Sequence, residues 1–575
     1  MQTGMHPHGN RRFGRLSVIA VVSALALTGL GLGTANARPS GPPAAQAAAH
    51  PAKLPPPPCH TPPGSTEPVC STQEAQDQVN TLTATLAYWQ ANAMTFARSH
   101  PGPLDIADYD IAPLWQEGID GSGTTVAVIE GWDDASIGSV MSAFDTRYDL
   151  PAADITTIYP DGPLPATCPP GMVALGSYGS CSAWAGELTL DVETVHMIAP
   201  YAKIIISATP ADSEVSDDQA DQVAPPEMMK ALEVIGGQHL ANVISISDGT
   251  GETTYTYGDS ELKAQNAGEL AAAADGVPVL VATGDCGVVQ NLAVASSQCG
   301  DTSTTPDTAA WDDSPWITAV GGSVPQVSST GTITGSDVLW PSSGAGYSSV
   351  YPRPGYQDAV SRSSGATMRS VPDITMDSHD GTSESAPGFA GILALATQLK
   401  GGQDIGPINP ALYQIGPRGA AAGIVDITSG NNSIKLRSTG TTVAGFSAGP
   451  GFDVASGWGT IDAAMFAPAL DLAAEQDSPV ARAQAAAQLR AMEHVQLTPS
   501  AIASGAGAYL LAGNFLPMHP VQLSVDGQPV TTLSANELGD VTYMLDPAAL
   551  GLSAGRHTVT LTSMLLTETG SFSTS

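Results

Sequence analysis

Basic side chains are few in this sequence. Its 575 residues include 20 lysines and arginines against 55 aspartates and glutamates, which gives a formal net charge of −35 at pH 7. Nucleic-acid-binding proteins need basic patches to neutralise phosphates, so this balance argues against a nucleic-acid partner. An acidic surface is common among secreted proteins, and it also suits a protein that works in acid, where protonated carboxyls no longer repel one another.

Long apolar segments are also few. After residue 37 no stretch is long and apolar enough to cross a bilayer. Near the start, three arginines between residues 11 and 15 precede an apolar run at 16–32, and a small-residue cleavage site ends at Ala37. This order is typical of an export signal. We therefore expect residues 1–37 to be a signal peptide and the protein to be secreted, without a membrane span.

Cysteines number only 6, and no two stand in the Cys-x-x-Cys spacing that would favour a metal site. An even number in an exported chain favours disulfides. The cysteines fall into neighbouring pairs, although spacing alone leaves their connectivity open. We expect the pairs Cys59–Cys70, Cys168–Cys181 and Cys286–Cys299.

The middle of the chain alternates between two patterns. Short apolar runs typical of buried strands lie at 125–129, 204–207, 243–247 and 279–282. Segments with helical character lie between them, at 185–198, 226–236 and 260–274. This alternation predicts an α/β fold with a mostly parallel sheet and helices on both faces. Ligand sites in such folds lie at the carboxyl ends of the strands.

The two ends of the chain differ from its middle in composition and in residue pattern. Residues 38–72 are rich in Pro and Ala, and 73–99 resembles one helix without an obvious partner. After 496 short strands alternate with turns, and Asp526-Gly527 is a hairpin signal. We expect a signal peptide (1–37), a tail with a helix (38–104), an α/β domain (105–477), a linker (478–495) and a C-terminal β-sandwich (496–575).

Four polar motifs look unusual for packing alone. The stretch GELTLDVETVHM places Glu187 and Asp191 one helical turn apart, on one face. Asp285 follows a buried strand, and Ser383 in GTSESAP stands at a strand-to-helix turn. Asp426 and the GPGFD stretch at 449–453 form the fourth. Each has an ordinary interpretation: a solvated helix face, a turn, a helix cap or a loop.

Together, and in this order, the motifs resemble the sedolisins, the serine-carboxyl peptidases with a subtilisin-like fold. That family carries Glu-x-x-x-Asp, then an Asp after a strand, then Gly-Thr-Ser-x-x-x-Pro and a calcium loop. The segments at 109–130, 243–249 and 314–323 are similar to the family as well, so the resemblance covers about 105–470. It implies a subtilisin-like fold and a peptidase that cleaves polypeptides.

The resemblance implies a role for each acid. Glu187 would be the base that activates Ser383, and Asp191 would orient Glu187 and share protons with it. Asp285 would carry a proton and donate to the oxyanion. A carboxylate base at Glu187 and a protonated carboxyl at Asp285 both suit acidic pH. The rival assignment is a subtilisin-type Asp-His-Ser triad, but neither His196 nor His379 stands in a His-Gly-Thr-His setting.

The resemblance also implies a Ca²⁺ site with oxygen ligands, which suit this hard cation. Its ligands would be two side chains and three backbone carbonyls, from Asp426, Ile427, Gly449, Gly451 and Asp453. The glycines can equally serve a tight turn.

Three features depart from the family pattern. The 38–108 segment is shorter than the folded propeptide usual in the family, and Pro372-Asp373 lies only ten residues before Ser383. Asp380 stands where the family tends to have Gly. We expect a monomeric, secreted, acid-acting endopeptidase. The alternative is a non-catalytic subtilisin-like scaffold that binds peptides or a surface polymer.

Overall fold

The computed structural model describes residues 72–96, 102–170, 172, 180–209, 226–290, 304–328, 332–361, 365–437 and 439–575. The expected signal peptide, the Pro-rich segment and Cys59, Cys70 and Cys299 lie outside these residues. None of the helices in the described ranges is long and apolar enough to cross a membrane.

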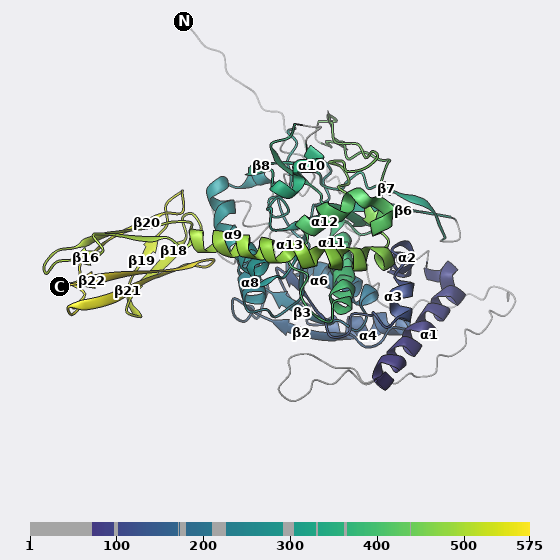
Figure 1. Cartoon of the computed structure of the whole chain (residues 1–575), viewed down its shortest axis with the longest axis horizontal. Helices are drawn as coiled ribbons and strands as arrows, with labels where there is room; N and C mark the ends of the chain where they lie inside the picture. The colour runs from purple at the N-terminus through teal and green to yellow at the C-terminus, as the bar shows by residue number, and fades with distance from the viewer. Residues whose placement is uncertain are drawn as a thin grey trace, which may run out of the picture. The chain divides into compact units, whose positions relative to one another are not determined.

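The largest sheet has eight strands in the order β10-β6-β5-β4-β1-β3-β2, with β7 paired to β6. Figure 1 labels β2, β3, β6 and β7 of this sheet. Every pair is parallel except β6 with β7. The strands are β1 (Thr125–Glu130), β2 (Asp154–Ile158), β3 (Lys203–Ala208), β4 (Val243–Ile246), β5 (Val279–Ala282), β6 (Thr318–Val327), β7 (Ile333–Leu339) and β10 (Ile374–Asp377). The expected α/β class with a mostly parallel sheet is confirmed.

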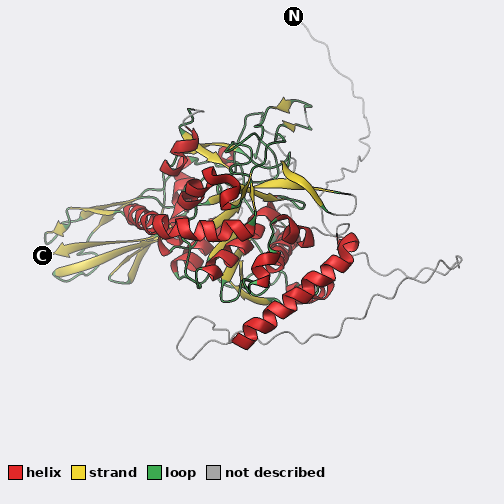
Figure 2. Ribbon diagram, turned by 45° about the vertical axis from the view of Figure 1, so that its right-hand side comes forward, coloured by secondary structure: helices red, strands yellow, loops and turns green. Residues whose placement is uncertain are grey.

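Helices cover both faces of this sheet (Figure 2). Successive side chains of a strand point to opposite faces, so one strand supplies two cores. Val126 and Val128 join the core formed with the first group of helices, whereas Ala127 and Ile129 join the core formed with the second. The first group contains α6 (Cys181–Ile198), α11 (Thr382–Leu399) and α13 (Ala463–Met492), and the second contains α8 (Pro226–Gly237) and α9 (Asp259–Asp275).

The remaining elements surround this framework. The other helices are α2 (Gly102–Asp108), α3 (Ala112–Gln116), α4 (Ile137–Tyr148), α10 (Asp358–Ser361) and α12 (Asn409–Ile415), with short 3₁₀ turns at Glu252–Thr254, Gly355–Gln357 and Gly416–Ala422. The small paired strands are β8 (Gly346–Pro352), β9 (Met368–Val371), β11 (Ile424–Val425), β12 (Ile434–Lys435), β13 (Thr442–Val443) and β14 (Thr460–Ile461).

Helix α1 (Thr72–Phe96) belongs to the core, so the interpretation of this segment as a helix without a partner was wrong. Leu82 and Trp89 are buried, and they lie seven residues apart on one face. The Trp89 indole donates to the Tyr148 carbonyl at 2.6 Å. Its ring centroid lies 5.7 Å from that of Trp115. The partners come from distant segments, which a local pattern cannot reveal.

The C-terminal strands form two sheets around a separate core, as the predicted β-sandwich requires. The hairpin at Asp526-Gly527 has positive φ at both residues, 49° and 75°, which is the backbone of a type I′ turn. The strands are β15 (Val495–Thr498), β16 (Ala501–Ile502), β17 (Ala508–Ala512), β18 (Pro520–Val525), β19 (Gln528–Ser534), β20 (Val541–Leu545), β21 (Gly555–Thr562) and β22 (Thr567–Thr574).

The segment expected as a linker, 478–495, forms the second half of α13, which starts earlier than the sequence suggested. Asp462 caps this helix by accepting from the Met465 amide at 3.1 Å. Buried alanines at 474, 481 and 485 continue one face of α13 through the expected boundary. The domain boundaries stay a prediction.

Candidate active site

Polar side chains collect where the parallel strands end. Glu130 is the last residue of β1, Ser247 follows β4, and Asp285 follows β5 closely. Ser383 lies six residues beyond β10, in the first turn of α11. Helix α6 packs against α11 and β1 and carries Glu187. The structure thus brings together residues that are spread over 250 positions of the sequence, at the sheet edge where α/β folds bind ligands.

Ser383 is held at the start of a helix that is buried almost completely. Thr382 and Glu384 are buried, whereas Ser383 itself is half-buried. The preceding Gly381 has φ of 95°, and a Cβ there would lie 2.5 Å from an Asp285 oxygen. Only glycine fits this position, because it tolerates both the left-handed backbone and the close contact. The Gly-Thr-Ser sequence therefore places the serine hydroxyl at an open helix start.

Glu187 and Asp191 differ in their burial and in the groups that they contact. Glu187 is half-buried and lies close enough to Ser383 for the serine side chain to lower its pKa. Asp191 is fully buried, and the Ser247 hydroxyl lies 2.9 Å and 3.0 Å from its two carboxyl oxygens. The same hydroxyl lies 3.2 Å from the Ser383 carbonyl. Ser247 thereby connects the Asp191 carboxyl to the backbone of Ser383.

Burial raises the pKa of both carboxyls. The pKa of Glu187 rises to about 7, although its hydrogen bond with Ser383 lowers it. The pKa of Asp191 rises well above its usual range through burial and the neighbouring Glu187 charge. Water reaches one side of Glu187 and can solvate its ionised form, whereas Asp191 has no such access. Glu187 is therefore the member of the pair that ionises first.

Sequence reasoning missed Glu130, which extends the carboxyl pair. Glu130 is fully buried next to Asp191, and within the described ranges neither of its carboxyl oxygens receives a hydrogen bond from a donor group. Burial, followed by the charges of Asp191 and Glu187, raises its pKa well above the usual range. A shared proton between the two carboxyls satisfies both. A glutamate that ends an otherwise apolar strand was the available signal.

Asp248 is a second residue that the motifs did not reveal. It follows Ser247, is half-buried, and its Oδ2 is enclosed without a hydrogen-bond partner in the described part of the chain. Burial raises its pKa well above the usual range, and the Glu187 charge raises it further. Four carboxyls, those of Glu187, Asp191, Glu130 and Asp248, therefore form one group, which Glu187 connects to Ser383.

Asp285 lies on the other side of Ser383 and opens to the surface. One of its oxygens accepts from both the amide and the hydroxyl of Thr382, each at 2.9 Å. The surrounding protein atoms raise the pKa of Asp285 even though its surface is exposed, and the two Thr382 hydrogen bonds lower it. Its carboxyl thus stands beside the open helix start, within reach of a substrate.

The two histidines of the rival triad are engaged elsewhere. His196 is buried at the end of α6, with Nε2 at 3.0 Å from the Pro151 carbonyl and 3.1 Å from Asp145 Oδ1. His379 lies four residues before Ser383, where it acts electrostatically on Asp377. No hydrogen bond joins either ring to Ser383 within the described ranges.

The residues of the expected calcium loop come together. Asp426 accepts from the Gly451 amide at 2.8 Å, while its other oxygen is buried without a partner in the described ranges. Asp453 accepts from the Gly449 amide at 2.8 Å and from Ser456. No cluster of three or more His, Cys, Asp or Glu side chains suited to a metal occurs in the described part of the chain. Two carboxyls and backbone oxygens remain a donor set that fits Ca²⁺, with the orphaned Asp426 oxygen as its clearest sign.

The cysteines near the site form disulfides. A bond joins Cys168 to Cys181, the first residue of α6. Cys286, next to Asp285, is also disulfide-bonded, to a partner outside the described residues.

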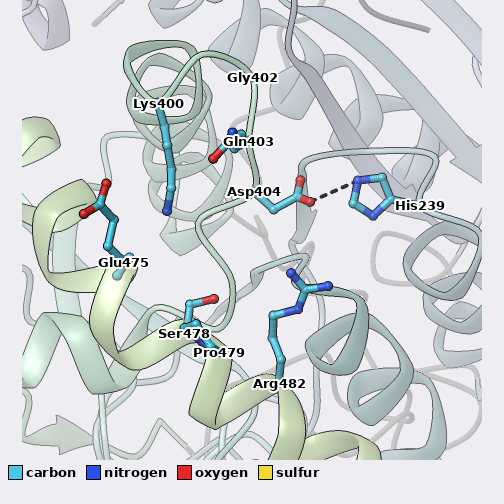
Figure 3. A pocket seen from close by; sticks show the side chains of 10 residues that line it. His239, Lys400, Gly402, Gln403, Asp404, Glu475, Ser478, Pro479 and Arg482 are labelled. Carbon is cyan, nitrogen blue, oxygen red and sulfur yellow. Dashed lines mark ion pairs between the residues drawn. The ribbon is translucent and has the colours of Figure 1, made fainter.

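A pocket of about 750 Å³ lies at the opposite end of α11 (Figure 3). Several of its charged side chains are paired with protein groups: His239 Nε2 lies 3.1 Å from Asp404 Oδ2, and Lys400 Nζ lies 3.6 Å from Asp471 Oδ1. Helix α11 has 18 residues, which separates this pocket from Ser383 by about 25 Å. The pocket is therefore not part of the serine site.

A serine at a helix start, a carboxyl hydrogen-bonded to it and a mostly parallel sheet are features of α/β hydrolases that use a serine nucleophile with a carboxyl partner. Comparisons with known proteins narrow this class. Kumamolisin from Bacillus sp. (strain MN-32) is 29% identical over 422 residues, which cover 68% of this chain and 67% of that protein. Tripeptidyl-peptidase 1 of Bos taurus is 34% identical over 244 residues, covering 36% of this chain and 41% of that one. No family model matches the chain.

Among solved structures, a Pseudomonas sedolisin, a serine-carboxyl proteinase, is similar with a TM-score of 0.49 and 23% identity, over 61% of this chain and 92% of that one. The chain is thus similar to members of the sedolisin family, the serine-type peptidases with a subtilisin-like fold. It spans about two thirds of the length of kumamolisin and about two fifths of tripeptidyl-peptidase 1.

Proposed function

We propose that this protein is a secreted endopeptidase that hydrolyses polypeptides at acidic pH, with Ser383 as nucleophile. The observation that carries the proposal is the closeness of Ser383 to Glu187, the half-buried member of the carboxyl pair on α6, whose pKa the serine side chain lowers. A carboxylate in that position can take the hydroxyl proton. The export signal expected at residues 1–37 supports secretion.

The first half of the reaction forms an acyl-enzyme. Ser383 Oγ attacks the carbonyl carbon of the scissile bond while its proton passes to Glu187. The negative charge that develops on the carbonyl oxygen faces Asp285, whose protonated carboxyl donates a hydrogen bond to it. When the intermediate collapses, Glu187 returns the proton to the leaving amine. In the second half, water replaces the amine and the same groups release the acid product.

This mechanism requires Glu187 ionised and Asp285 protonated in the same molecule. The raised pKa of Asp285 keeps its proton to a higher pH than an ordinary aspartate would. The pKa of Glu187, about 7, makes its carboxylate scarce in acid but a stronger base when it forms. Activity should therefore rise as Glu187 ionises and fall as Asp285 loses its proton.

We also propose that a Ca²⁺ ion stabilises the loop of Asp426 and Asp453. The Ile427, Gly449 and Gly451 carbonyls would complete its oxygen shell, and Asp426 Oδ1 would gain the partner that it lacks in the described structure. The ion would stabilise the fold and would take no part in bond cleavage.

The test is incubation of the purified protein with an unfolded protein at pH 3–5, followed by fragment analysis, with Ser383→Ala as the matched control. We expect cleavage by the wild type only. The alternative, a non-catalytic scaffold that binds peptides or a surface polymer, predicts binding without cleavage by both proteins. Equal cleavage by wild type and Ser383→Ala would contradict the serine mechanism.

A further inference from the structure

A second group of carboxyls lies beneath the turn that carries Ser383. Asp105 comes from α2, Asp377 is the last residue of β10, and Glu384 follows the nucleophile in α11. All three are buried, with 4%, 1% and 4% of their surface exposed. None of the three belongs to the Glu187 pair or contacts the expected calcium ligands in the described structure. The mechanism above assigns them no part.

Asp377 is the centre of this group. It is buried, and the Ser378 amide lowers its pKa, but within the described ranges neither of its carboxyl oxygens has a hydrogen-bond donor in ordinary geometry. The carboxyl of Asp105 lies within hydrogen-bonding range of Asp377. Two buried carboxylates in contact repel one another strongly, whereas one proton between them forms a hydrogen bond. The geometry therefore requires a proton at this contact.

Glu384 connects this contact to the nucleophile's turn. Its Oε2 accepts from the Asp380 amide at 2.9 Å, and its carboxyl also accepts from the His379 amide. These two amides belong to the loop between β10 and α11. The hydroxyl of Ser385 donates to the Asp377 carbonyl at 2.8 Å and fixes the other end of the loop. Displacement of the Glu384 carboxyl would therefore free the loop that presents Ser383.

The groups that face this cluster are almost all acidic. Asp108, the last residue of α2, and Tyr109, which follows it, approach the cluster, and β7 contributes Asp337. The loop before α11 contributes Asp380 and His379, of which only the histidine can carry a positive charge. No lysine or arginine forms an ion pair with any of these acids in the described part of the chain. Protons are thus the main counter-charge available.

We propose that Asp105, Asp377 and Glu384 are positioning residues that share protons and hold the Ser383 turn in place in acid. Above acidic pH the cluster ionises, its members repel one another, and α2 and the β10–α11 loop separate. The nucleophile then loses its alignment with Glu187. This inference rests on the proposed role of Ser383.

The pKa values of Asp377 and Asp105 are both raised, as shared protons require. Burial raises the pKa of Asp377 to about 6, and burial followed by the charges of Glu384 and Asp377 raises the pKa of Asp105 well above its usual range. An acid whose pKa is raised on folding stabilises the native state fully below its unfolded pKa of about 4. This stabilisation is lost as the pH rises toward the folded value, which for Asp377 is about 6. The cluster should hold at pH 4 and weaken between pH 4 and 6.

The test replaces a protonated carboxyl by an amide that never ionises. In Asp105→Asn the amide NH₂ can donate to ionised Asp377, and in Glu384→Gln the amide oxygen can still accept from the Asp380 amide. We expect each variant to move the alkaline midpoint of the activity–pH profile upward by about one pH unit. The matched control is Glu117→Gln, which removes an exposed carboxyl from the same region and should leave the midpoint unchanged.

A second measurement does not need activity. In a Ser383→Ala background, the melting temperature at pH 4 and pH 7 should differ less in Asp105→Asn and Glu384→Gln than in the parent. An unchanged alkaline midpoint and an unchanged melting difference would overturn the inference, and so would variants that are inactive or unfolded at pH 4. If wild-type protein cleaves nothing at any pH, the proposed function fails, while the melting series still tests whether the cluster needs its protons.

Discussion

The sheet edge that carries Ser383 and the β18–β19 hairpin of the β-sandwich hold their acids in opposite ways: Asp377 is buried, whereas Asp526 is 44% exposed. At the edge, Asp377 contacts another carboxyl. In the hairpin, Asp526 Oδ2 lies 2.6 Å from His557 Nδ1 and Oδ1 accepts from the Thr558 amide at 2.8 Å. The first arrangement needs a proton on an acid, and the second needs a proton on a base. Acid pH supplies both.

The pKa shifts follow this contrast. The hydrogen bond with His557 lowers the pKa of Asp526, and the same bond raises that of His557. The pair is therefore complete from about pH 4 to about pH 6.5, and the contribution of His557 is lost only as the pH rises through its raised value. The stabilisation that the Asp377 contact provides decreases over this same pH range. Local electrostatics, rather than the total charge of −35, decides how each region responds to pH.

The largest expected effect, on the rate of hydrolysis, comes from substitutions of the carboxyls around Ser383. Glu187→Gln removes the base, so we expect kcat/KM to fall by about 10⁴-fold or more, with Asp191→Asn close behind. Asp285→Asn should cost less, because an amide can still donate to the oxyanion. Initial rates on one peptide substrate at pH 4 measure all three. His557→Gln, in β21 beside the hairpin, should keep the wild-type rate per folded molecule, and a loss comparable to that of Glu187→Gln would contradict the separation of the two regions.

The next effect concerns the packing that supports the edge. Trp89 contacts Trp115, whose indole donates to the carbonyl of Ile198, the last residue of α6, at 3.0 Å. Trp89→Ala should therefore lower the free energy of unfolding by about 3–5 kcal/mol. Denaturant unfolding at pH 4 in a Ser383→Ala background measures it. Leu472→Ala, at a site that is 60% exposed, is the matched control. Equal stability of both variants would mean that α1 is dispensable.

Calcium removal should have an intermediate effect. A ligand at 100 times its Kd that binds only the native state contributes about 2.7 kcal/mol, so chelation should lower the melting temperature by about 5 °C. Asp426→Ala should show the lower value with or without added Ca²⁺. Elemental analysis of the purified protein provides an independent check. The site would be refuted by protein that contains no calcium and whose melting temperature does not respond to it.

The smallest effect should come from the hairpin pair. His557→Gln removes the imidazolium that faces Asp526, so the melting temperature should fall slightly at pH 5. The difference from wild type should shrink as the pH rises above about 6.5 and the wild-type histidine loses its charge. Scanning fluorimetry across this range measures it. A difference that grows with pH would mean that the ion pair does not stabilise the hairpin.

Much of the framework was predictable because its signals are local. The apolar runs indicated four central strands, and their alternation with helices indicated the parallel sheet. The spacing of Glu187 and Asp191 predicted a shared helix face, which α6 provides. Asp526-Gly527 predicted the hairpin, because two adjacent residues with positive φ need these side chains.

The tertiary structure alone decided which carboxyls meet. Glu130 reaches Asp191, and Asp105 reaches Asp377, through parallel strands and a helix that are far apart in the chain. The burial of Trp89 has the same origin. Periodicity along the sequence states that a segment has an apolar or polar face, but the partner of that face depends on sheet order and packing. The sequence by itself therefore determined the chemical groups and their local geometry, whereas the fold determined their neighbours and, through burial and charge, their protonation.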